Sequence, residues 1–107
     1  MSGNDIVAES VSGVAEIATP HARRYLQQLC KHFQHRLQVT FDAAAGSIEF
    51  VSGVCTLAAE NGVLRLSVMV RDASQLAQLQ DVVARHLVRF AFREELSVEW
   101  RAGQTRK

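Results

Sequence analysis

Apolar residues recur at intervals of three and four along two stretches of the chain, 19–36 and 72–95. At about 100° per residue, this spacing gathers them on one side of an α-helix and predicts two amphipathic helices. The inward positions of the first helix are Ala22, Leu26, Leu29, Phe33 and Leu37. Those of the second are Leu76, Leu79, Val83, Leu87 and Phe90. Thr19 and Asp72 are the expected N-caps, and Gln75 stands at the capping-box position of the second helix.

Most of the remaining chain alternates apolar and polar residues, which is the period of a β-strand with one buried face. This alternation predicts strands at 11–18, 37–41, 47–51, 54–59, 63–71 and 96–100. Asn61-Gly62 predicts a tight hairpin before the fifth strand, because type I′ turns need positive φ at both central residues. The side chains assigned to the inner face are Val11, Ala15, Ile17, Leu37, Val39, Phe41, Ile48, Phe50, Cys55, Leu57, Leu64, Leu66, Val68, Val70, Leu96, Val98 and Trp100.

The predicted element order is therefore β-α-β-β-β-β-α-β. Four consecutive strands with short turns favour an antiparallel meander. One-sided strands and one-sided helices bury their apolar sides against each other, so the expected fold class is α+β: a two-layer sandwich in which two helices cover one face of a mainly antiparallel sheet. The expected division is a flexible tail over 1–10, a single domain over 11–101, and a flexible basic tail over 102–107.

Composition agrees with one globular domain. The chain has 107 residues, of which 48% are hydrophobic and 21% charged. Its net charge of +1 gives no overall attraction to polyanions, so nucleic acid is not an expected partner. The two cysteines, Cys30 and Cys55, are both assigned to the core, and this favours a reducing, cytoplasmic location. No apolar run has the length of a membrane span or the form of a signal peptide, so no membrane association is expected.

Histidines and arginines concentrate on the edges and outer sides of the two predicted helices. His32 and His35 lie on the first helix, and His86, Arg89 and Arg93 lie on the second. We expect His32 and His86 to lie on the facing rims of the two helices and to line one shallow polar site, with Arg89 adding positive charge. Structural interpretations stay open beside this one. In these, His86 is a core histidine bonded to the backbone, and the arginines form a solvated basic face.

The Cys30–His32–His35 spacing does not make a metal site on a helix. Cys30 and His32 diverge by about 160°, so they cannot bind one ion, although His32 and His35 can face the same way. Two ligands do not complete a coordination shell. Whether any metal binds stays open, and no cofactor is expected.

Several runs resemble one bacterial protein family. The runs RYLQQLCKHFQHR, IEF and LQDVVARHLVRFAFREELSVEW are similar to the family catalogued as domain of unknown function 2218, over roughly residues 11–101. The most specific motifs are CKHFQHR and HLVRFAFREEL. The resemblance implies a small bacterial protein. Some members carry a dihydroxyheptenedioate aldolase label, and related domains occur joined to siderophore-interacting flavin reductases. The family has no settled catalytic residues, so the motifs only draw attention to His32, His35, His86, Arg89 and Arg93.

These patterns favour a non-catalytic binding or accessory module over an enzyme. A Schiff-base aldolase needs a desolvated lysine, but the chain has only Lys31, on the basic outer face, and Lys107, its last residue. The expected ligand is a small anion or a metal chelate of the iron–siderophore kind, held by His32, His35, His86, Arg89 and Arg93. A protein-interaction or homodimerisation module, indicated by Phe92, Met69 and Val63 outside the core pattern, is an alternative. An aldolase-type enzyme is a second alternative.

Overall fold

The computed structural model describes residues 11–103 and shows the predicted element order. The strands are β1 (Val11–Ala18), β2 (Gln38–Phe41), β3 (Ala45–Glu49), β4 (Gly53–Glu60), β5 (Val63–Val70) and β6 (Arg101–Ala102). The helices are α2 (Ala22–Phe33), a 3₁₀ turn η1 (Ala73–Gln75) and α3 (Leu76–Phe90). The expected tail at 1–10 and residues 104–107 of the tail expected at 102–107 lie outside the described residues. Ala102 belongs to β6, and the Gly103 N–H donates to the Ser12 carbonyl oxygen, so these two residues pair with β1.

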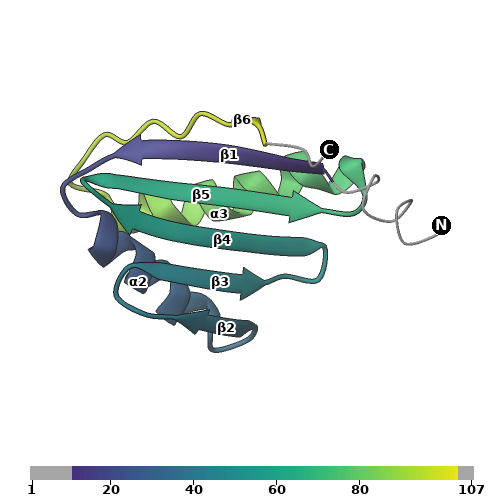
Figure 1. The fold of residues 1–107 in the computed structure, drawn as a ribbon, viewed down its shortest axis with the longest axis horizontal. Coiled ribbons are helices and arrows are strands. Elements are labelled where there is room, and N and C mark those ends of the chain that lie inside the picture. The colour runs from purple at the N-terminus through teal and green to yellow at the C-terminus, as the bar shows by residue number, and fades with distance from the viewer. Residues whose placement is uncertain (1–10, 104–107) are drawn as a thin grey trace.

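The six strands form one antiparallel sheet in the order β2-β3-β4-β5-β1-β6. Both helices lie on the same side of it, behind the sheet in the view of Figure 1. The α+β two-layer prediction is therefore confirmed. Asn61 and Gly62 have φ values of 53° and 75°, which are the positive angles that the predicted hairpin between β4 and β5 requires.

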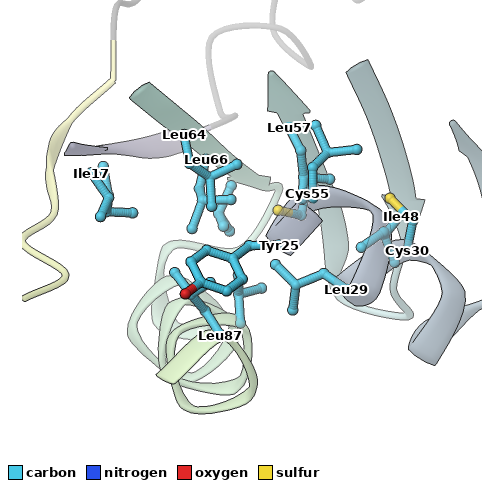
Figure 2. Packing of buried hydrophobic residues seen from close by; sticks show 14 of the residues in the cluster. Ile17, Tyr25, Leu29, Cys30, Ile48, Cys55, Leu57, Leu64, Leu66 and Leu87 are labelled. Atoms are coloured by element: carbon cyan, nitrogen blue, oxygen red, sulfur yellow. The ribbon is translucent and has the colours of Figure 1, made fainter. Parts of the chain in front are cut away.

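The core lies between the helices and the inner face of the sheet. Figure 2 shows Leu64 and Leu66 of β5 pointing from the sheet toward Tyr25 of α2 and Leu87 of α3. Most of the inward positions given by the two periodicities are buried, and they form one cluster. Cys30 and Cys55 are buried and unpaired, and burial raises the pKa of their thiols to about 11 and about 12. Both thiols are therefore protonated at neutral pH.

Both predicted helix starts are wrong in detail. The N-cap of α2 is His21 and not Thr19, because the Thr19 hydroxyl accepts from the His21 N–H (3.1 Å) and itself donates to Glu94. Asp72 caps η1 instead of α3, through a 3.0 Å hydrogen bond from the Ser74 N–H. The Gln75 N–H donates to the Asp72 carbonyl oxygen, which makes a tight turn and not the expected capping box.

Two predicted strands also differ from the structure. The strand expected at 47–51 is β3, two residues earlier, and Val51 is fully exposed in the turn that follows. The segment 96–100 is not a strand; pairing with β1 begins only at β6. Leu96, Val98 and Trp100 are nevertheless half-buried against the core. Every second side chain of this segment contacts the core, although the backbone forms no strand. The segment therefore has the alternating pattern that is typical of a strand. α3 ends at Phe90, and Phe92 is 75% exposed.

No helix within residues 11–103 is long and apolar enough to cross a membrane.

Replacing Leu66 or Leu79 with alanine should lower the free energy of unfolding by about 2–5 kcal/mol each, because each change leaves a cavity in the core. Leu66 is fully buried and Leu79 is 4% exposed. Urea denaturation measures the loss, and Gln78→Ala on the exposed side of α3 is the control, with an expected change within about 0.5 kcal/mol. Losses as small as the control's at both leucines would show that the inner faces are misassigned.

Candidate functional site

The two helices meet along an edge where each carries a histidine. The rings of His32 on α2 and His86 on α3 are 4.9 Å apart between centroids, with 43° between their planes. On α3, His86 lies at the edge of the apolar stripe that contains Val83 and Leu87. On α2, His32 comes one residue before Phe33, which belongs to the apolar stripe of that helix. The helices therefore bring together the two residues that the sequence placed on facing rims.

Three phenylalanines extend this pair into an aromatic cluster. His32 contacts Phe33 and Phe90 edge to face, with centroid distances of 4.9 and 5.6 Å. Phe33 in turn packs against Phe50 at 5.1 Å and against His86 at 4.9 Å. Edge-to-face contacts of this kind add stabilisation beyond simple burial. Packing thus holds both imidazoles in place, and it does not engage all of their ring nitrogen atoms in hydrogen bonds.

A groove opens beside this cluster, at the C-terminal end of α2. Its volume is about 590 Å³, within the range of small-molecule sites. It is lined by His32, Phe33, His35, Arg36, Leu37, Phe50, Val82 and His86. Four of these residues are apolar, and the other four are histidines and an arginine. The lining therefore combines an apolar surface with groups that can donate hydrogen bonds or carry positive charge.

A backbone hydrogen bond fixes the tautomer of His86. Its Nδ1 lies 2.7 Å from the carbonyl oxygen of Val82, one helical turn earlier. A carbonyl oxygen only accepts, so Nδ1 carries the proton and Nε2 of the neutral ring carries a lone pair. Histidines that bind metals are commonly oriented by this kind of bond. The backbone bond expected of a structural histidine is therefore present, and it leaves Nε2 available.

The surroundings of His32 favour its neutral form. Loss of water from the packed side of the ring lowers its pKa below the ordinary 6.5, and the positive charge of His86, His35, Arg89 and Arg36 lowers it further. At neutral pH the ring therefore carries a lone pair on one nitrogen. A neutral imidazole at this position can accept a hydrogen bond or bind a cation, and protonation turns it into an anion-binding group.

The structure gathers only part of the predicted site. His32, His35 and His86 line the groove, and Arg89 acts on His32 through its charge without lining it. Arg93 lies over the ring of Phe92, 5.3 Å from its centroid, and does not line the groove. Arg36 lines the groove but is absent from the predicted site residues, because it comes at the end of the first predicted helix, outside its apolar stripe. Phe50 was missed as a lining residue because it had been assigned only to the core.

Comparison with family models settles which family the sequence belongs to. The model of uncharacterised proteins conserved in bacteria, DUF2218, matches residues 14–101. The chain belongs to the DUF2218 family. The resemblance noted in the sequence is thereby confirmed.

One solved structure is similar to this chain in sequence and fold. The NMR structure of PA4090 from Pseudomonas aeruginosa is 33% identical to this chain, with a TM-score of 0.72. The match covers 85% of this chain and 95% of that one. None of the curated proteins matches this chain.

The histidines of this DUF2218 protein do not form a complete metal site by themselves. Within residues 11–103, no three side chains of histidine, cysteine, aspartate or glutamate converge as metal ligands. His32 and His86 provide at most two donors, and four are usual for zinc. A metal at this groove would need donors brought by its own ligand.

A second polar cluster holds the other end of the helix pair. The Glu94 carboxylate accepts hydrogen bonds from the buried Thr19 hydroxyl, at 3.0 and 3.1 Å to its two oxygens, and a short one from Tyr25. Nε2 of His21 lies 3.9 Å from the carboxylate. The Tyr25 bond lowers the pKa of Glu94, with a further contribution from Thr19. The cluster ties the turn after α3 to the start of α2, which sequence periodicity gave no means of finding.

Glu94→Gln should destabilise the protein most at neutral pH and progressively less in acid. A carboxylate whose pKa is lowered by folding stabilises the native state above its ordinary value of 4.5, and loses that effect as pH falls through the folded-state value. Thermal unfolding of wild type and variant between neutral pH and about pH 3 measures the difference. Glu95→Gln, a change at the exposed neighbouring residue, is the control. A difference in melting temperature that stays constant with pH would contradict this role for Glu94.

Proposed function

We propose that this DUF2218 protein is a non-catalytic, cytoplasmic binding module that holds a small, planar anion in the groove beside His32 and His86. The observation that carries the proposal is the pairing of these two imidazoles, 4.9 Å apart, at the rim of a groove with an aromatic lining. The free, buried Cys30 and Cys55 fit a reducing compartment.

The two parts of the lining suit the two parts of such a ligand. Phe33, Phe50, Leu37 and Val82 offer an apolar surface against which a flat ring can pack. Arg36, at the rim, offers the forked donors that match a carboxylate or a catecholate. None of the lining residues is acidic, so no negatively charged side chain of the lining repels an anion there.

An oxygen-rich ferric chelate is the more specific form of this ligand class. Its own oxygens would fill most of the coordination shell, because the two histidines cannot. The Nε2 atom of His86, left free by the bond to Val82, would be one protein donor, and His32 the second. A binding role also fits the composition of the groove, which has no cysteine, lysine or carboxylate in its lining.

The test is calorimetric titration of wild type, His32→Ala and His86→Ala with 2,3-dihydroxybenzoate and with its ferric complex. Each replacement should weaken binding about tenfold or more, the equivalent of one lost charge-assisted hydrogen bond. Melting temperatures should fall only modestly, because each replacement removes contacts at the edge of the aromatic cluster and the bond from His86 to Val82 lies within one helix. His21→Ala is the matched control, a histidine at the other end of the same helix, and should bind as wild type does.

The pH dependence separates the two ligand forms. The pKa of His32 lies below the ordinary 6.5, so this ring gains a proton only as the pH falls below that value. Its protonation should strengthen binding of the metal-free anion and weaken binding of the ferric complex, which needs a neutral imidazole. The proposal fails if wild type binds neither compound at millimolar concentration. It also fails if His86→Ala melts far below wild type while binding is unchanged, since His86 would then be structural.

A further inference from the structure

The sheet has a second face, on which no helix lies within residues 11–103 (Figure 1). Strand alternation turns the core residues toward the helices and their neighbours toward this outer face. The pairing register then fixes which outer side chains stand side by side. One row crosses the centre of the face: Thr40, Ser47, Thr56, Ser67 and Val14. The row on one side of it is Ala45, Ala58, Arg65 and Glu16. The row on the other side is Gln38, Glu49, Val54, Met69 and Ser12.

Charged side chains stand in the two rows on either side of the central row. The central row has no charged residue, and Met69 beside it is a half-exposed apolar side chain. Arg65 and Arg101 both approach Glu16, at 3.8 and 3.5 Å. Glu49 stands in the row of Met69, on β3, and Glu60 stands at the end of β4. Met69 and Arg65, which flank the central row on β5, are of the two residue types that protein–protein interfaces favour.

The arrangement of large and small side chains points to a second copy of this chain as the partner. Consider a two-fold axis parallel to the strands, between β4 and β5, relating two sheets packed face to face. The register places Met69 over the partner's Val54, Arg65 over the partner's Ala58, and Ser67 over the partner's Thr56. Each large side chain thus meets a smaller one. We propose that the protein forms a symmetric homodimer through this outer sheet face.

A hollow in the face supports this geometry. It has a volume of about 520 Å³ and is lined by Glu16, Ala18, Ala58, Glu60, Asn61, Val63 and Arg65. Arg65 lies over the partner's Ala58, which lines the same hollow in the partner. The Arg65 side chain therefore enters the partner's hollow, one row from the partner's Glu60. Glu16 and Glu60 of both copies surround the two arginines that flank the axis. The same contact is made twice, as a two-fold interface requires.

The area of the face sets the expected strength. Strands about 4.8 Å apart and up to eight residues long give on the order of 500 Å² of flat surface per copy. This is less than the roughly 800 Å² per partner that stable interfaces bury, so we expect a weak dimer that dissociates at micromolar concentrations. The ligand groove beside His32 is on the helix side of the sheet and stays open in such a dimer.

Sedimentation velocity across micromolar to millimolar concentrations tests the dimer. Wild type should change from monomer to dimer within this range. Thr56→Lys puts a charge at the centre of the interface and should weaken association about tenfold or more, which is ~1.4 kcal/mol. Gln78→Lys adds the same charge on the exposed side of α3 and should associate as wild type does.

A charge exchange tests the proposed axis. Glu60→Arg places positive charge beside the partner's Arg65 and should weaken the dimer, whereas the double variant Glu60→Arg/Arg65→Glu should restore it. Wild type that stays monomeric throughout the range would overturn the proposal. So would a dimer that Thr56→Lys leaves intact, or one that is lost on replacing the exposed Phe92 with serine, because either result assigns the contact to another face.

Discussion

The structure depends on the burial of two helical stripes against one face of an antiparallel sheet. Leu26 and Leu29 of α2 and Leu87 of α3 pack with Leu64 and Leu66 of β5 in a single core. Full burial of each such side chain contributes about 1.5–3 kcal/mol, compared with a net contribution of about 0.5–1.5 kcal/mol from a typical hydrogen bond. Two helices that share one sheet face must lie side by side, so the residues flanking their stripes are forced to meet. The polar chemistry of the protein is concentrated along that line of contact.

The two ends of this contact line differ in their physical character. At one end, Glu94 accepts hydrogen bonds from the buried hydroxyls of Thr19 and Tyr25, so its acceptor capacity is used within the protein. At the other end, His32 and His86 are held by aromatic packing and one backbone bond, and nitrogen lone pairs remain free beside a groove. A polar group whose bonds are satisfied internally serves the fold, and one held in place but left unsatisfied can serve a ligand. This difference is why the histidine end is the candidate site.

Sequence periodicity was enough to predict the fold and the meeting of His32 with His86. Both histidines stand at the edge of a stripe, and the edges of neighbouring stripes lie together once the helices share a sheet. Periodicity could not find the Glu94 cluster, because Tyr25 and Thr19 lie 69 and 75 residues away from Glu94, and a helix or strand repeat relates only residues of the same element. It gave the wrong cap for α2 for the same reason, since Thr19 is bonded to Glu94. Arg93 was expected at the site because it belongs to the motif HLVRFAFREEL. The helix ends at Phe90, and Arg93 lies over the ring of Phe92 instead.

The account depends most on His86 having one nitrogen bound to the backbone and the other available to a ligand. Histidine-selective ¹H–¹⁵N NMR of the labelled protein observes both nitrogens directly. At neutral pH the account predicts a proton on Nδ1 of His86 and none on Nε2. On addition of an aromatic carboxylate, the ring signals of His32 and His86 should shift together while those of His21 stay unchanged. A proton on Nε2 of His86, or ring signals that the carboxylate does not move, would contradict it.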